Sequence, residues 1–174
     1  MLIYHLKEKV GLKNSLNNMT ENILIYKIAF WAKRFKLGEI YLKRDNKTKY
    51  MGYISMYEGK PIFCYNMKYV NESKRYTEAF IFHELGHIIN KTYLWKKVKK
   101  IDKIRSEYLA EKFCYEMTEK YFPNELERMT KQIFNLVYRK DWQKRFPIHT
   151  TAFTKLYLEK TGHKDAILYS RYSF

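Results

Sequence analysis

The spacing of apolar residues along the chain predicts a mixed first part and a helical second part. From Ile23 to Phe35, apolar residues recur every three or four positions, as on one face of a helix, and Thr20 can begin that helix. Three strands are expected next, because the following stretches are rich in residues that favour extended backbone. The predicted strands are residues 39–42, 50–57 and 62–65, and the turn Glu58-Gly59-Lys60-Pro61 joins the last two into a hairpin.

Helical spacing returns after the hairpin. We expect residues 66–73 to form a connecting loop and residues 75–90 to form a helix that is apolar over much of its circumference and therefore buried. Further helices are predicted over residues 106–121, 124–139 and 150–160, with Pro123 and Pro147 as breaks between them. The predicted fold class is α+β, with a short antiparallel three-stranded sheet packed on the buried helix and a mainly helical C-terminal part.

Composition and charge exclude few classes of function. The 174 residues fit one domain, or one domain with an appendage, and a hydrophobic content of 46% is enough for a packed core. The chain has 34 Lys and Arg against 18 Asp and Glu, and its formal net charge of +16 would attract acidic partners or nucleic acid. The basic residues are spread along most of the chain, however, and abundant Lys, Tyr, Ile and Asn are equally typical of a biased genomic composition. The charge alone therefore selects no function.

The cysteines and the hydropathy favour a cytoplasmic protein. Cys64 and Cys114 match neither a close-spaced zinc pattern nor a disulfide framework, so we expect two buried, reduced thiols. Charged residues interrupt the apolar positions of the first fourteen residues, so no signal peptide is expected there. No stretch is long and apolar enough to span a membrane.

Five residues of the predicted buried helix, His83-Glu84-Leu85-Gly86-His87, carry the main chemical signal. Four residues along a helix rotate by about 400°, so His83 and His87 project from one face, one turn apart. Their ring nitrogens can converge on one Zn²⁺ ion at roughly 2.0–2.1 Å each. Glu84 lies about 100° around the helix, where its carboxylate can take a proton from metal-activated water. The pattern predicts a zinc peptidase with Glu84 as its base, against the alternative of two ordinary helix histidines.

A catalytic zinc ion usually has three protein ligands, and two histidines leave one ligand to be found. Glu107, at the start of the next predicted helix, is the best candidate. Glu111 lies one turn further on and could orient a zinc-bound histidine through its second ring nitrogen, or it could be an ordinary solvated carboxylate. Weaker candidates for the third ligand are Asp102, Glu116 and Glu119.

Residues 52–117 resemble the ImmA/IrrE family of small bacterial metallopeptidases. The resemblance rests on Gly52 in a strand, on residues 61–66 before the loop, on the motif at 83–87 and on the stretch from Glu107 to Met117, which is similar to the family's Glu-x-x-Ala-x-x-Phe-Ala helix. It implies a gluzincin-like site, with His83, His87 and Glu107 on zinc and Glu84 as the base. We therefore expect a zincin-like domain over residues 1–123 and a helical extension over residues 124–174.

The resemblance also implies the kind of substrate. We expect an endopeptidase that cleaves a specific protein, such as a DNA-binding repressor of a mobile element. The strand at 62–65 could hold an extended substrate by strand addition, and His149 or His163 could stabilise the oxyanion. A function of a different class is also open: an inactive zincin-like module that regulates a partner or binds nucleic acid. The basic cluster at 96–103 suggests nucleic-acid binding, although such clusters are commonly solvated loops.

Overall fold

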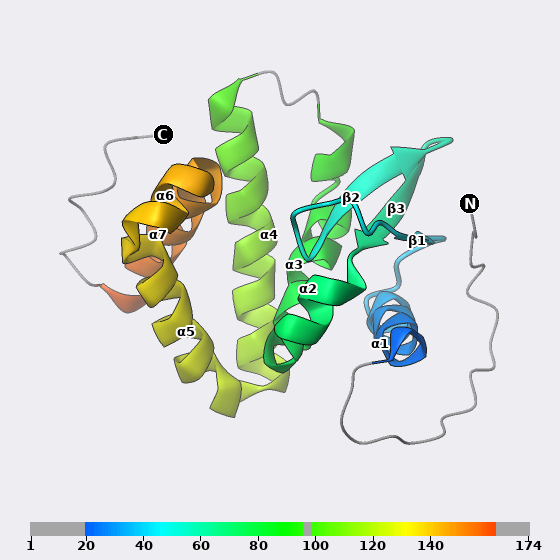
Figure 1. Ribbon diagram of the computed structural model, residues 1–174, viewed down its shortest axis with the longest axis horizontal. Helices are drawn as coiled ribbons and strands as arrows, with labels where there is room; N and C mark the ends of the chain where they lie inside the picture. The colour runs from blue at the N-terminus through cyan, green and yellow to red at the C-terminus, as the bar shows by residue number, and fades with distance from the viewer. Residues whose placement is uncertain (1–19, 96–98, 163–174) are drawn as a thin grey trace. The chain divides into compact units, whose positions relative to one another are not determined.

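The computed structural model describes residues 20–95 and 99–162, and the chain divides into two units, Met1–Leu94 and Trp95–Phe174. The first unit contains the sheet and the second is helical (Figure 1). Seven α-helices and three strands lie within the described ranges, so the predicted α+β class is confirmed. The units divide after Leu94. The expected zincin-like domain over residues 1–123, with a helical extension over residues 124–174 packed on the same domain, stays a prediction.

The described elements of the first unit run from an N-terminal helix through the sheet to the helix that carries the histidines. In chain order they are α1 (Glu21–Arg34), β1 (Tyr41–Arg44), β2 (Gly52–Tyr57), β3 (Lys60–Tyr65), α2 (Met67–Glu72), the short 3-10 helix η1 (Lys74–Tyr76), α3 (Thr77–Ile89) and the short 3-10 helix η2 (Thr92–Leu94). The predicted first helix, hairpin and buried helix are confirmed. The Thr20 hydroxyl accepts a hydrogen bond from the Ile23 amide and so begins α1, as expected.

The sheet is mixed, and the prediction of an antiparallel sheet is only partly right. β2 pairs with β3 antiparallel, but β1 pairs with β3 parallel, and the strand order is β1-β3-β2. The burial pattern explains the order. Five of the six residues of β3 are buried, whereas the ends of β1 and β2 are exposed. The most buried strand thus takes the central position, and the two strands with exposed ends form the edges.

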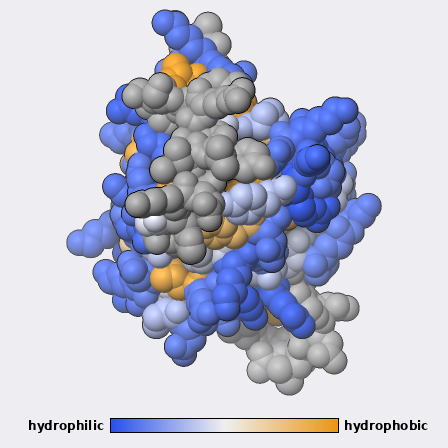
Figure 2. Space-filling view, turned by 90° about the vertical axis from the view of Figure 1, so that its left-hand side faces the viewer, coloured by the Kyte–Doolittle hydropathy of each residue, from blue (hydrophilic) through white to orange (hydrophobic). Residues whose placement is uncertain are grey.

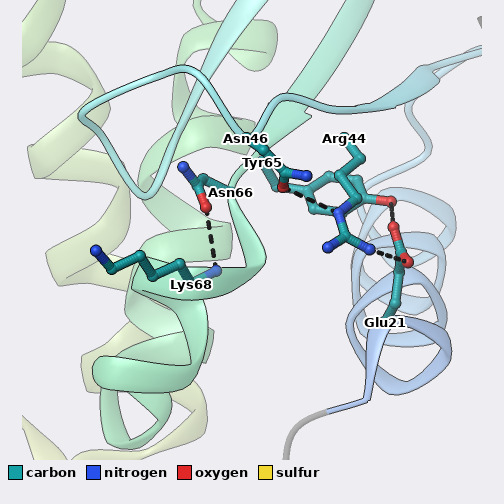
Figure 3. Close-up of polar contacts among 6 residues, drawn as sticks. All are labelled: Glu21, Arg44, Asn46, Tyr65, Asn66 and Lys68. Atoms are coloured by element: carbon teal, nitrogen blue, oxygen red, sulfur yellow. Dashed lines mark hydrogen bonds and ion pairs between the residues drawn. The ribbon is translucent and has the colours of Figure 1, made fainter.

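The predicted loop at 66–73 is wrong, because it contains helix α2. The Asn66 side chain accepts a hydrogen bond from the Lys68 amide at 3.1 Å, which caps the first turn (Figure 3). Its amide group also donates to the Thr48 carbonyl at 3.0 Å. Asn66 therefore joins the start of α2 to the turn that precedes β2.

Helix α1 is attached both to the sheet and to α3. At its first turn, Glu21 accepts hydrogen bonds from the Tyr65 hydroxyl at 2.7 Å and from Arg44 at 3.2 Å (Figure 3). Further along, the Trp31 indole donates to Glu78 of α3 at 2.7 Å, and its ring packs edge-to-face on Phe82. These contacts attach α3 to α1 at positions within two turns of His83.

The second unit is built on one long helix. Its described elements are α4 (Lys100–Tyr121), α5 (Pro123–Tyr138), α6 (Lys140–Arg145) and α7 (Pro147–Thr161), and α4 packs most extensively on α7. α4 begins six residues earlier than predicted, because Asp102 accepts a hydrogen bond from the Lys99 amide and stabilises the first turn.

The ends of the last helices follow from a proline and a glycine. Pro147 was expected to break the chain, but it is the first residue of α7, where its missing N–H costs nothing. Gly162 ends α7 in the left-handed conformation, with φ 66°. The short helix α6 was not predicted. No helix in the described ranges is long and apolar enough to cross a membrane.

The sheet and α3 approach each other closely at Gly52. A Cβ at this position would lie 2.5 Å from the Cys64 carbonyl oxygen and 2.6 Å from the Phe80 ring of α3. Both distances are far below van der Waals contact, and the carbonyl belongs to the backbone of the central strand, which cannot move aside freely. Gly52 is therefore required by space and not by its backbone dihedrals.

We expect Gly52→Ala to lower the free energy of unfolding by about 1–3 kcal/mol, as overpacking of a core does. Urea denaturation followed by circular dichroism measures this change. Gly38→Ala is the matched control, because nothing lies within 4 Å of a Cβ built there. Equal stabilities of the two variants would contradict the close approach at Gly52.

Candidate metal centre

Helix α3 presents its two histidines on one face, as the spacing predicted. The rings of His83 and His87 have centroids 5.1 Å apart and are nearly perpendicular, at 84°. His87 is buried, with 7% of its surface exposed, and His83 is half-buried. The helix itself is apolar on most sides, so the imidazoles are polar groups set in an apolar surrounding that strengthens their electrostatic interactions.

A buried threonine fixes the orientation of His87. The Thr92 hydroxyl oxygen lies 2.8 Å from Nδ1 of His87 and 3.4 Å from the His87 carbonyl oxygen. A hydroxyl has one proton to donate, and when Thr92 donates it to this carbonyl, its oxygen accepts the Nδ1–H of the ring. The other ring nitrogen, Nε2, then carries the lone pair that a metal ion needs.

Thr92 was not predicted from the sequence, although its position has a local cause. Asn90 ends α3 by donating from its side chain to the Gly86 carbonyl, and Lys91 adopts a left-handed conformation with φ 52°. This turn brings the chain back along the end of the helix, so Thr92 reaches the ring of His87 and is itself fully buried. A polar residue just past the end of a metal-binding helix is the signal that could have identified it.

Glu84, the predicted base, is also buried, with 6% of its surface exposed. Glu84 makes contacts within the protein, but its oxygen Oε2 is buried and accepts no hydrogen bond from the described part of the chain. Buried carboxylate oxygens are ordinarily satisfied by protein, water or a bound ligand.

Burial raises the pKa of the nearby Cys64 thiol, and the charge of Glu84 adds a smaller increase, so Cys64 stays a neutral, unreactive thiol.

In the second unit, α7 supplies a polar partner to each of the two acids of α4. Glu107 has a side chain that is 15% exposed, and its Oε2 lies 3.4 Å from Nε2 of His149. Glu111 is 3% exposed and accepts a hydrogen bond from the Tyr157 hydroxyl at 3.1 Å. Burial raises the pKa of Tyr157, and the charge of Glu111 raises it further, so this hydroxyl keeps its proton and remains a donor.

One group of side chains in the described ranges could hold a metal ion: His83, His87 and Glu107. Each offers one ligand atom, and these atoms lie within 4.8 Å of one another. Two imidazoles and a carboxylate suit zinc and also other divalent transition metals. The sequence predicted this trio, and among the described residues it is the grouping that the structure brings together.

Other predicted site residues have different places. Asp102 accepts a hydrogen bond from the Lys99 amide at the first turn of α4. Glu116 and Glu119 lie further along that helix, outside the group that could hold a metal ion. His163 and residues 96–98 of the basic cluster lie outside the described residues. The predicted role of Glu111 towards a zinc-bound histidine stays a prediction.

The prediction that a substrate pairs with the strand at 62–65 disagrees with the observed sheet. Residues 62–65 belong to β3, which pairs with β1 on one side and with β2 on the other, so its backbone groups are already used. An added strand would have to pair with one of the outer strands.

The chain matches no family model, no curated protein and no solved structure. The resemblance to the ImmA/IrrE family therefore stays a prediction that rests on the residues of the motif and of its flanks. The function therefore has to be inferred from the residues and the geometry of the site.

We expect Thr92→Val to weaken zinc binding by about 10–100-fold, because the isosteric valine removes the hydroxyl that orients His87. Competition with a chromophoric zinc chelator measures the dissociation constant. Thr92→Ser keeps the hydroxyl and should bind zinc nearly as well as the unmodified protein. Undiminished affinity in Thr92→Val, with the fold verified by circular dichroism, would show that Thr92 has no role in orienting the ligand.

Proposed function

We propose that this protein is a zinc-dependent endopeptidase of the ImmA/IrrE kind. The observation that supports the proposal is the grouping of His83, His87 and Glu107, with Glu84 next to the first histidine on the same helix. Three ligands of this type leave room for water and substrate at the metal, as catalytic zinc sites do. A structural zinc site would instead have four protein ligands, usually including cysteine, whereas the group formed by the described residues contains three ligands and neither of the buried cysteines.

The residues divide the work of peptide hydrolysis among them. His83, His87 and Glu107 would hold the ion, which when bound supplies Lewis acidity towards the scissile carbonyl and makes water a better nucleophile. Glu84 accepts the proton of the attacking water and then donates it to the leaving amine. Thr92 keeps Nε2 of His87 available for the metal, and the apolar surroundings of α3 limit competing water.

The substrate in this proposal is a protein, cleaved in an extended segment. β2 is the outer strand that packs against α3, through Gly52 and Phe80, so we propose that the segment pairs with β2 and not with β3. A DNA-binding repressor as substrate and a cytoplasmic location belong to the same proposal and derive from the resemblance. The net charge of +16 would favour acidic sequences near the cleaved bond.

We expect Glu84→Gln to abolish cleavage, by at least about 100-fold, because the amide cannot accept a proton, while zinc binding persists. The zinc-loaded proteins can be incubated with a mixture of proteome-derived peptides, and new termini identified by mass spectrometry. Glu119→Gln, at an exposed position of α4, is the matched control and should cleave normally. Cleavage by Glu84→Gln at the normal rate would rule out this carboxylate as the base.

A second candidate function, a nucleic-acid-binding module, is favoured by the charge and by the exposed Lys99, Lys100 and Lys103. Hydrophilic side chains also predominate among the described residues on the face that Figure 2 draws. Such surfaces are common on soluble proteins, however, and no base-reading element has been identified among the described helices.

Replacing Lys96, Lys97, Lys99 and Lys100 with Gln separates the two functions. We expect the fourfold variant to cleave peptides as the unmodified protein does, because the cluster holds none of the proposed ligands. A duplex-DNA affinity that falls steeply with salt, and that this variant loses, would favour the nucleic-acid-binding function instead.

A further inference from the structure

We propose that His149 is a positioning residue for Glu107 and that α7 is the element that orients the carboxylates of α4. This inference rests on the proposed function, in which Glu107 is a metal ligand. It gives His149 of α7 a different role from the oxyanion stabilisation that the sequence suggested for it. All the contacts that carry it lie within the second unit.

The first observation is the polar contact itself. Nε2 of His149 lies 3.4 Å from Oε2 of Glu107, and both side chains are more buried than exposed, at 30% and 15% exposure. Contacts of this kind commonly shorten when a site binds its ligand. When Nε2 of His149 donates a proton to Oε2, the histidine holds the carboxylate in one rotamer and so sets the direction in which Glu107 meets a metal ion.

The second observation is that aromatic rings hold His149 in place. Phe146 and Phe153 each pack edge-to-face on its imidazole, with ring centroids 5.9 Å away in both cases. Trp142 of α6 packs in turn on both phenylalanines, at 5.4 and 6.0 Å. Three aromatic side chains from α6, α7 and the residue between them therefore fix the imidazole independently of any metal. Rigid support of this kind is what a positioning residue needs.

The third observation is the parallel pair one turn further along α4. Tyr157 of α7 donates to Glu111 as His149 contacts Glu107, and the Tyr157 ring is itself packed on Tyr115 and Phe134. Two acids of one helix each meet a polar group of the same partner helix, and each polar group is fixed by aromatic packing. This repetition is the arrangement expected of a helix that orients carboxylates, beyond simple packing.

The test measures zinc affinity by chelator competition, so it does not depend on finding a substrate. We expect His149→Phe to weaken zinc binding by about 10–100-fold, because the ring packing is kept and the N–H donor is lost. His149→Gln is the matched control, because its amide can place a donor near the position of Nε2 and should restore most of the affinity. Thermal melting of the metal-free variants verifies that each one folds.

The Glu107→Ala variant tests the proposed ligand set separately from the positioning role of His149. If Glu107 is a ligand, this variant binds zinc weakly, and adding His149→Phe to it causes no further loss, because the histidine acts through the carboxylate. Unchanged zinc affinity in Glu107→Ala would refute the ligand set of the proposed function. If Glu107→Ala weakens binding but His149→Phe does not, or if the two losses add, the positioning role is overturned while the proposed ligand set stands.

Discussion

Helix α3 buries the imidazole of His87 and the carboxylate of Glu84 together with its apolar residues. The stability of the first unit depends on how the lost hydration of these two polar groups is compensated. Polar groups without partners are strongly unfavourable in an apolar interior. The Thr92 hydroxyl gives His87 a hydrogen-bond partner at the end of the helix, and the sheet and α1 pack on the apolar sides of the helix. The result is a rigid helix on which two ring nitrogens and one carboxylate keep fixed directions, and this is the property on which a metal centre depends.

The second unit follows the same rule with different residues. Its long helix α4 carries two acids that are mostly or wholly buried, and α7 provides an imidazole to one and a phenol to the other. In both units, therefore, the supporting group comes from a neighbouring element. Support of this kind costs the protein flexibility but removes the need to order the side chains when a ligand arrives.

The sequence predicted the features that depend on local spacing. Helices α1 and α3, the hairpin and the trio of candidate metal ligands follow from periodicity and from a motif with a mechanical reason. The parallel pairing of β1 did not follow, because it depends on which strand is buried on both faces, a property of the packed sheet. Thr92 was not predicted, and His149 was named only as a candidate for oxyanion stabilisation, because each contacts a side chain of another element and nothing in the local pattern of a single threonine or histidine reveals that contact.

The order of elements along the chain has a consequence for biosynthesis. Chains are made and folded from the N-terminus, so α3 and Thr92 leave the ribosome before α4, and α4 leaves before α7. In the proposed site, a nascent chain would thus hold a metal ion with two imidazoles at most until Glu107 and then His149 emerge. A newly made protease of this design would gain its full metal affinity only after α7 has emerged, and the shorter nascent chain would be protected from its own activity.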